Sequence, residues 1–267
     1  MIATVPQKGS PRVLPIARLL LGLALLSMAA CAARPPADDP DAVAEYKELN
    51  DPLEPTNRVF YKVNDTIDTY ALRPVAVAYR DYVPGVVRRP IRNVLNNLGQ
   101  PANFANDVLS AKPRRAGDSL MRFLINTTAG GLGLFDVAAD WGYPDHSSDL
   151  GQTFALWGVD AGPYLFLPII GPSNPRDAVG FGGNTVLDPL TWATFGADTA
   201  VNLTRYGANA VDTRERFIEP IDSVKRTALD PYATFRSVSR QNRADEIAKA
   251  KEDLPATVPA WFPQPAR

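Results

Sequence analysis

Residues 57–72 read NRVFYKVNDTIDTYAL, and their apolar side chains recur at intervals of three and four residues. The recurring positions are Val59, Phe60, Val63, Ile67, Tyr70 and Ala71. This spacing places them on one face of an α-helix. Pro55 lies just upstream and suits a first helical turn, where its missing N–H would have no partner in any case. The stretch therefore predicts an amphipathic helix.

Further short amphipathic stretches, separated by proline and glycine, predict a mainly α fold. One runs from Val87 to Leu98, and Gly99 and Pro101 are expected to end it. Arg73-Pro74 is expected to end the helix over residues 57–72 and to start the next one. Further helical stretches cover Phe104–Leu109 and Leu120–Thr127, and the second of these is broken at Gly130-Gly131. A last helix is expected to begin after the Asp230-Pro231 cap. A strand is expected only at Gln152–Val159.

The segment from Trp141 to Pro175 differs from the rest because it is rich in glycine, proline and aromatic residues. It contains the apolar run Tyr164–Ile170, which lies between two prolines. Short apolar runs are usually buried, so a core segment is favoured. In a membrane-anchored protein the same run is equally suited to facing lipid or to lining a lipid path.

The N-terminal residues have the pattern of a bacterial export signal. Three basic residues precede the apolar stretch Leu19–Leu26, which is too short to span a bilayer comfortably, and Ala29-Ala30 precedes the only cysteine, Cys31. The site resembles a lipobox, although Met28 stands where leucine is usual. We expect cleavage before Cys31, which would carry N-acyl and S-diacylglycerol lipid. The alternative is a free or buried thiol near an ordinary signal site.

These features divide the chain into four segments. Residues 1–30 form the signal peptide and residues 31–49 the lipid anchor and tether. Residues 50–250 form the helical domain, which is long enough for one sizeable core. Residues 251–267 form a proline-rich tail.

The composition argues against most enzyme chemistry. With one cysteine and one histidine, the chain has no candidate thiolate cluster or multi-histidine metal site, so we expect no metal and no cofactor. His146 lies in a turn-like stretch and is predicted to be a solvated loop residue rather than a catalytic base. The 28 basic and 29 acidic residues balance, so nucleic acid is not an expected partner. A lipid-modifying hydrolase that uses a serine, His146 and an aspartate is a distant alternative.

Arginine residues provide candidate contacts for phosphate groups. Arg88, Arg89 and Arg92 are the first choice, together with Arg114 and Arg115. The guanidinium group matches phosphate with two parallel hydrogen bonds. For any one of these side chains, the alternative is an ordinary solvated charged surface.

Several ordered sequence blocks resemble the MlaA (VacJ) lipoproteins. They are Asn50-Asp51-Pro52-Leu53-Glu54, Asn57-Arg58, Arg73–Tyr79, Arg122–Thr128 with Gly130, Gly133 with Asp136, Asp149–Thr153, Trp157–Val159, Gly162–Tyr164, Leu167-Pro168, Gly171–Ser173, Arg176-Asp177 and Asp230–Tyr232. The resemblance extends over about Asn50 to Arg243. Departures occur at Thr56, Leu150 and Ala155, where the family often has an aromatic residue, Phe and Gly.

The resemblance implies a ring-like bundle of short amphipathic helices with one hairpin-like segment rich in glycine and proline. Such proteins sit in the inner leaflet of the outer membrane of Gram-negative bacteria. Through an amphipathic channel they remove phospholipids misplaced in the outer leaflet, and they pass these lipids to a periplasmic carrier of the MlaC type. Trimeric porins are the usual membrane partners, and no covalent bond is broken. The alternative is a lipid-anchored scaffold that moves no lipid.

By the same resemblance, the stretch Asp149–Gly162 matches a family hairpin that borders the channel. Glycines permit unusual backbone conformations, so a gating loop is one interpretation and a rigid packed hairpin is the other. The candidate channel or gating residues are Val59, Phe60, Val63, Leu150, Gly151, Phe154, Leu156, Trp157, Gly158 and Gly162.

Overall fold

The computed structural model describes residues 51–191 and 198–252. The chain divides into two compact units after Leu53, and the helices and strands described here belong to the second unit, which begins at Glu54. The predicted signal segment, the lipidated Cys31 and the tail beyond residue 252 lie outside the described residues. No helix within the two described ranges has the length and apolarity needed to cross a membrane.

The predicted first helix is confirmed, with an unexpected last turn. Helix α3 (Glu54–Ile67) passes directly into a π-helical turn, η1 (Asp68–Leu72), and then into α4 (Arg73–Tyr82). A proline lies in the first turn of α4, as its sequence position predicts. The chain therefore stays helical through Arg73 instead of breaking there.

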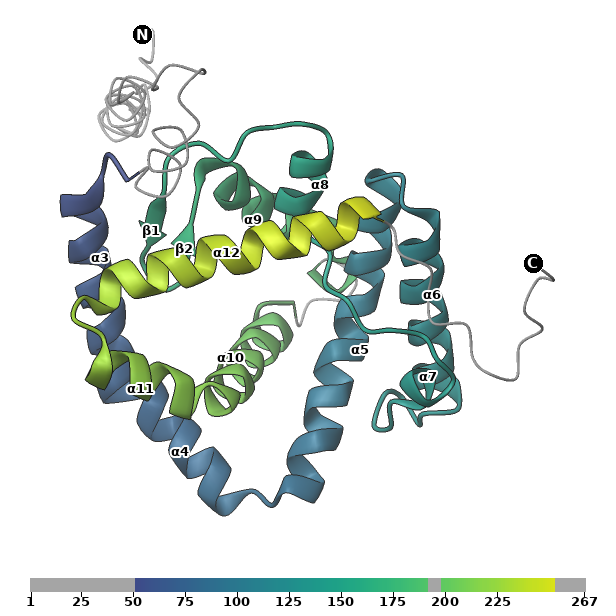
Figure 1. The fold of residues 1–267 in the computed structure, drawn as a ribbon. Coiled ribbons are helices and arrows are strands. Elements are labelled where there is room, and N and C mark those ends of the chain that lie inside the picture. Colours follow the sequence, from purple (N-terminus) through teal and green to yellow (C-terminus); the bar gives the residue numbers. More distant parts are fainter. Residues whose placement is uncertain (1–50, 192–197, 253–267) are drawn as a thin grey trace, which may run out of the picture. The chain divides into compact units, whose positions relative to one another are not determined.

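Helix α5 (Gly85–Leu109) is longer than the sequence predicts. Gly99 and Pro101 do not end it, so that prediction was wrong. One face of the helix is buried on both sides of Pro101. Burial and hydrogen bonding of that face outweigh the weak local preference of glycine and proline. Helix α6 (Pro113–Thr128) packs against α5 (Figure 1).

The Gly/Pro-rich segment does contain a hairpin, but not where a strand was expected. Residues 152–159 begin inside helix α8 (Leu150–Leu156), whose first turn is capped by the Asp149 carboxylate, 2.8 Å from the Gln152 N–H. The strand prediction there was wrong because this side-chain cap favours a helix. The hairpin lies later, with β1 (Leu165–Leu167) antiparallel to β2 (Gly171–Ser173).

The remaining helices complete the unit. They are α7 (Val137–Asp140), α9 (Pro175–Leu187), the 3₁₀ turn η2 (Pro189–Thr191), α10 (Asp198–Arg216), α11 (Ile218–Thr227) and α12 (Pro231–Glu252). Helix α12 begins after the Asp230-Pro231 cap, as predicted, and the Ala233 N–H donates to the Asp230 carboxylate. The sequence patterns did not identify α9, α10 or α11.

Arginine–carboxylate pairs connect the early helices of the unit to its late helices. The pairs are Arg58–Asp230 at 2.6 Å between α3 and the start of α12, Arg73–Asp222 at 2.7 Å between α4 and α11, and Arg92–Asp212 at 2.8 Å between α5 and α10. Figure 1 shows α12 running from the α3 side to the α5–α6 side. At its far end, Lys112 before α6 donates to the Lys251 carbonyl. Within this unit, the arrangement is the expected ring-like helical bundle.

A small aromatic cluster forms the core. Tyr164 and Phe166 of the hairpin meet Tyr232 of α12, and Phe60 and Tyr61 of α3 pack against them. The ring centroids of Tyr61 and Phe166 lie 5.6 Å apart, edge to face, which is a favourable geometry for aromatic pairs. The hairpin is thereby packed between the first and last helices of the unit.

Two asparagines of α3 hold the hairpin backbone. The Asn57 amide donates to the Tyr164 carbonyl at 3.0 Å and accepts from the Phe166 N–H at 2.9 Å. In the same way, the Asn64 amide donates to the Leu167 carbonyl at 3.0 Å and accepts from the Ile169 N–H at 2.7 Å. The first part of the apolar run is core, as favoured, because Tyr164 and Phe166 are buried. Its end is not core, because Ile169 and Ile170 are exposed.

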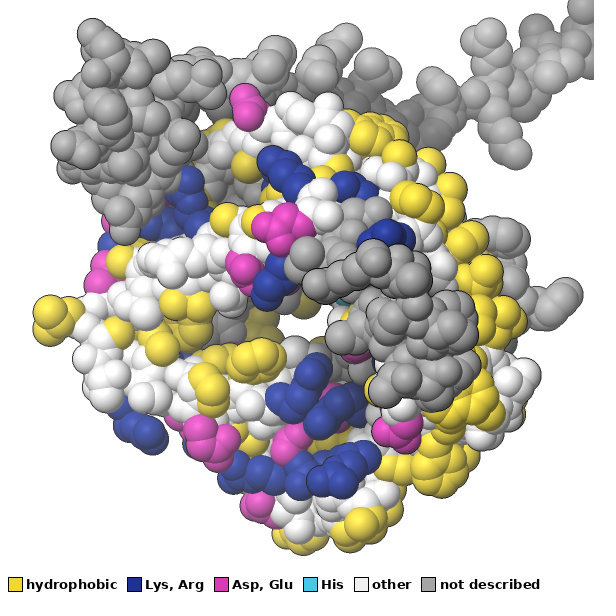
Figure 2. All heavy atoms as spheres, turned by 45° about the vertical axis from the view of Figure 1, so that its right-hand side comes forward, with side chains coloured by type: hydrophobic (Ala, Val, Ile, Leu, Met, Phe, Trp, Pro, Cys, Tyr) yellow, Lys and Arg dark blue, Asp and Glu magenta, His cyan; other side chains and the backbone are white. Residues whose placement is uncertain are grey.

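The distribution of polarity is the reverse of that in a typical water-soluble domain. Within the described residues, eighteen polar or charged side chains are buried, against nine apolar ones. Many large apolar side chains are exposed, among them Val86, Leu132, Phe135 and Val186. Figure 2 shows hydrophobic side chains in a broad band along one edge, and a hollow near the middle with basic side chains below it. Large exposed apolar surfaces mark sites of contact with a membrane or partner.

Candidate functional site

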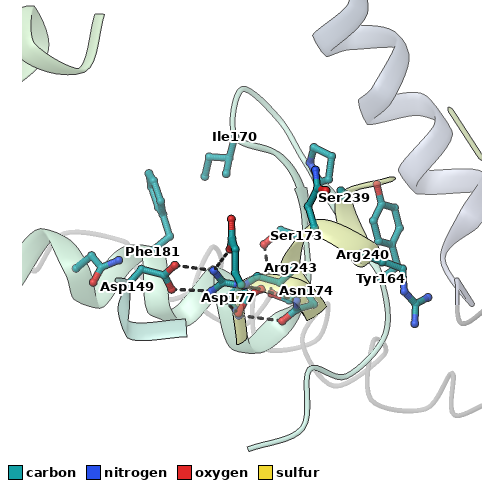
Figure 3. Close-up of a pocket in the computed structure, with 14 residues that line it drawn as sticks. Asp149, Tyr164, Ile170, Ser173, Asn174, Asp177, Phe181, Ser239, Arg240 and Arg243 are labelled. Carbon is teal, nitrogen blue, oxygen red and sulfur yellow. Dashed lines mark hydrogen bonds and ion pairs between the residues drawn. The ribbon is translucent and has the colours of Figure 1, made fainter. Parts of the chain in front are cut away.

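A pocket of about 460 Å³ opens among α8, the hairpin, α9 and α12 (Figure 3). Its lining has two chemically different parts. Apolar side chains come from the hairpin and from α9: Tyr164, Ile170, Pro172 and Phe181. Charged side chains come from α12 and from the N-terminal ends of α8 and α9: Arg240, Arg243, Glu246, Asp149 and Asp177. Such a lining suits an amphipathic molecule.

Arg243 organises the charged part of the pocket. It makes two bonds of 2.7 Å to Asp149 and bonds of 3.0 and 3.2 Å to Asp177. Burial would lower the pKa of Arg243, but the hydrogen bonds with the two carboxylates outweigh this effect and raise it. Burial would likewise raise the pKa of Asp177, but bonds from Arg176 and Arg243 lower it. Arg243 and Asp177 are therefore both charged at neutral pH.

Helices α8 and α9 meet beside this pocket through glycine. A Cβ atom on Gly180 would lie 2.3 Å from the Gly151 nitrogen and 2.6 Å from its Cα. The two backbones therefore touch, and neither residue tolerates a side chain. Gly183 similarly leaves space for Leu150, whose Cδ2 would lie 2.3 Å from an added Cβ.

The three candidate hinge glycines differ in their conformations. Gly151 is buried in α8. Gly158 and Gly162 have φ values of 90° and 74°, which glycine adopts readily and other residues rarely do. Gly158 and Gly162 thus occupy turns that need glycine, and Gly151 serves close packing. Gating by this stretch stays a prediction.

The other candidate channel residues do not gather at one place. Val59 and Val63 are exposed on α3, whereas Phe60 packs on the aromatic cluster. Phe154 and Trp157 lie with ring centroids 5.7 Å apart. The Trp157 indole donates to the Leu109 carbonyl of α5 at 3.0 Å, and the half-buried Leu156 precedes it. Among the described residues, none of these candidates lines the pocket, although Asp149 next to Leu150 does.

Two of the three candidate phosphate-binding arginines hold carboxylates. Arg92 pairs with Asp212, and both Arg88 and Arg92 pair with Glu215 of α10. Arg89 is exposed. The hydrogen bond to Asp212 raises the pKa of Arg92. A phosphate at Arg92 would have to compete with Asp212 and Glu215, and headgroup contact by these arginines stays a prediction.

His146 is not a solvated loop residue, so that prediction was wrong. Its side chain is only 12% exposed, because its Nε2 lies 2.8 Å from the Asp107 carboxylate and 3.1 Å from the Ser119 hydroxyl. Burial would raise the pKa of Asp107, but hydrogen bonds from His146 and Ser148 lower it. The cluster fastens residues 146–148 to α5 and α6.

The same cluster does not have the geometry of a hydrolase. A serine–histidine–aspartate triad uses opposite ring nitrogens for the serine and the aspartate. Here Ser119 and Asp107 meet the same nitrogen of His146, and the Ser119 hydroxyl also bonds to Asp107 at 2.8 Å. Ser119 is also fully buried. The arrangement is a structural hydrogen-bond network.

Sequence reasoning did not identify the pocket. Asp149 and Asp177 belong to the sequence blocks that resemble the MlaA family, whereas Arg243 is only the last residue of the region over which the resemblance extends. Residues 149 and 243 lie 94 positions apart, so spacing carries no sign that they meet. The only sequence signal for this site was the presence of charged residues of opposite sign at positions 149, 177 and 243.

A polar interior, an apolar exterior and a two-sided pocket define a class of helical proteins built for contact with amphipathic molecules. Residues 49–246 match the family model described as MlaA lipoprotein. The chain is 34% identical over 219 residues to the intermembrane phospholipid transport system lipoprotein MlaA of Haemophilus influenzae, with 79% of this chain and 86% of the relative covered. It is 33% identical over 214 residues to the same-named protein of Escherichia coli K12, with 79% and 83% covered.

A solved structure described as the structural basis for maintenance of bacterial outer membrane lipid asymmetry matches with a TM-score of 0.65 and 32% identity. The match covers 74% of this chain and 98% of that one. The chain belongs to the MlaA lipoprotein family.

Proposed function

We propose that this protein removes misplaced phospholipids from the outer leaflet of the outer membrane and passes them toward the periplasm. It thereby maintains lipid asymmetry as part of an intermembrane phospholipid transport system. Its relatives carry that transport name. The protein moves lipid without breaking a covalent bond, so it needs no cofactor and acts as a transport component rather than an enzyme.

The observation that carries the proposal is the reversed distribution of polarity. Apolar side chains such as Val86, Val186 and Leu203 are more than 70% exposed, while the interior holds Arg122, Asn106 and Asp107. Acyl chains can cover the exterior, and helices suit this position because they satisfy their own backbone hydrogen bonds. The hollow near the middle of the face shown in Figure 2, with basic side chains below it, is the proposed path for headgroups.

We further propose that acyl and diacylglycerol chains on Cys31 anchor the protein in the inner leaflet of the outer membrane. Several lipid chains give stable attachment, whereas one gives marginal binding. Trimeric porins are the proposed partners within the membrane, and a periplasmic carrier of the MlaC type is the proposed acceptor of lipid.

The central test is the amount of phospholipid on the cell surface. A strain lacking the protein should expose more outer-leaflet phospholipid than its parent, and a plasmid copy should restore the parental amount. An unchanged surface in the deletion strain would refute the proposal. Purified protein should also carry phospholipid from the membrane, whereas a scaffold would carry none.

A second test addresses embedding. The Cys31→Ser variant, exported with a cleavable signal, should still need detergent because the helices themselves contact acyl chains. A monodisperse protein without detergent would show that only the anchor holds the domain to the membrane.

A further inference from the structure

The turn of the hairpin holds an apolar residue in an unfavourable backbone conformation. Strands β1 and β2 pair Leu167 with Gly171, which leaves residues 168–170 as the connection. Ile169 has a φ of 70°. Branching at Cβ makes this left-handed region strongly unfavourable, and glycine or asparagine is the usual occupant. An observed strain of this kind points to a functional demand.

The strained conformation is fixed from outside the turn. Asn64 of α3 accepts a hydrogen bond of 2.7 Å from the Ile169 N–H and donates one of 3.0 Å to the Leu167 carbonyl. The backbone is therefore held, while the Ile169 side chain is 85% exposed. Packing within the fold does not explain the choice of isoleucine, because the side chain contributes almost no buried area.

The next residue belongs to the pocket. Ile170 lines it together with Tyr164, Pro172 and Phe181. Ile169 directly precedes Ile170 in the turn, with consecutive Cα atoms about 3.8 Å apart, and its own side chain is exposed. Figure 3 shows Ile170 on the turn and Phe181 on α9, both beside the Asp149–Arg243–Asp177 cluster.

The surroundings of the turn favour one kind of occupant. An apolar edge and a charged cluster share one pocket, so the occupant has a hydrocarbon part and a polar part. The hydrocarbon interior of a bilayer does not fit beside Arg243 and its two carboxylates, because burying those charges in lipid is unfavourable. A single phospholipid with its chain on the turn fits both parts.

We propose that Ile169 and Ile170 form an apolar lip that contacts an acyl chain of a phospholipid as the lipid enters this pocket. This proposal rests on the proposed transport function. The strain at Ile169 is then the result of placing a branched apolar side chain outward at a position where the turn itself favours asparagine or glycine.

The first experiment separates the strain from the contact. Ile169→Asn suits the left-handed conformation, so its melting temperature should equal or exceed that of the wild type. Its clearance of outer-leaflet phospholipid should fall by at least half relative to the difference between wild-type and deletion strains. Ile169→Val, which keeps a branched apolar side chain, should retain most clearance. Full clearance by Ile169→Asn at normal protein level would overturn the proposal.

A matched control addresses the backbone alone. Ala111 also has a positive φ, of 54°, and is exposed in the α5–α6 connection. Ala111→Gly relieves similar strain and should leave clearance unchanged. An equal loss of clearance in Ala111→Gly and in Ile169→Asn would mean that relief of backbone strain impairs transport. That result would also overturn the proposed acyl-chain contact.

Photo-crosslinking identifies the occupant without relying on transport. Benzophenone-alanine replacing Ile169 should crosslink phospholipid in detergent micelles doped with phosphatidylethanolamine. The same group replacing Val186, which is 72% exposed on α9, should crosslink lipid in proportion to the phosphatidylethanolamine content of the micelles, whereas crosslinking at residue 169 should saturate at a low content. Crosslinking at residue 169 only in vesicles would indicate the bilayer, and crosslinking to a protein would indicate a partner; either result overturns the proposal. If the deletion strain shows no rise in surface phospholipid, the proposed transport function fails. The crosslinking result still decides whether residue 169 contacts a phospholipid.

Discussion

Replacing Gly180 with alanine should destabilise the protein, although alanine is the better helix former. A Cβ atom at residue 180 would lie 2.3 Å from the Gly151 nitrogen and 2.6 Å from its Cα. Both are backbone atoms, so no side chain can move aside. Helices α8 and α9 would have to separate by roughly 1 Å to restore normal contact distances.

The size of the effect follows from two opposing contributions. Alanine in place of glycine inside a helix stabilises by about 0.5–1 kcal/mol. Overpacking a close contact destabilises by about 1–3 kcal/mol, and a backbone-to-backbone contact belongs at the upper end. The net loss is about 2 kcal/mol, which lowers the melting temperature by roughly 4–8 °C in a domain of this size.

Gly182→Ala is a matched control on the same helix. No heavy atom would lie within 4 Å of its added Cβ, so only the helix preference acts. It should raise the melting temperature by roughly 1–4 °C. Both variants can be compared with the wild type by far-ultraviolet circular dichroism during heating in one detergent. A Gly180→Ala protein that melts at or above the wild type would refute the close-contact reasoning.

Three other perturbations test the buried charges and the anchor. Asp107→Asn should lower the free energy of unfolding by about 2–3 kcal/mol, because the buried carboxylate accepts several hydrogen bonds. Because the pKa of Asp107 is lowered in the folded protein, its contribution to stability is present above the ordinary aspartate pKa and is lost as the pH falls through the folded-state pKa. The melting temperature should therefore fall less steeply with decreasing pH in the variant than in the wild type. An identical fall in both proteins would contradict this. Arg243→Ala should cost about 2–4 kcal/mol by removing the cation that Asp149 and Asp177 share, although Asp177 keeps its bond from Arg176. Arg243→Lys should recover part of this loss, as denaturant unfolding can measure. Mass spectrometry of the mature N-terminus should find acyl and diacylglycerol chains on Cys31, and an unmodified thiol would exclude the anchor.

Local sequence patterns predicted the helices that show a clear apolar periodicity. The pattern at residues 57–72 gave α3, and the Asp230-Pro231 cap gave the start of α12. The sequence misled where a few side-chain bonds outweigh composition, as at Asp149, which caps a helix where a strand was expected. It also misled at Pro101, where the buried polar face of α5 keeps the helix continuous.

The site was harder to predict than the fold. The interior is polar, so the rule that buried positions are apolar gives no guide to it. The His146 cluster and the Arg243 cluster each join groups from separate elements, and only the folded chain brings them together. The tight contact at Gly151 also had no sequence sign, because a glycine used for packing and a glycine used for a turn look alike.

The asparagine amide that holds the hairpin has a consequence for aggregation. A strand with an unpaired edge is a template on which other chains can add strands and aggregate. Asn57 bonds to the Tyr164 carbonyl just before β1 and to the Phe166 N–H within it, and so takes the place that a neighbouring strand would fill. The β1 edge of this two-stranded sheet is thereby closed to pairing with a strand of another molecule.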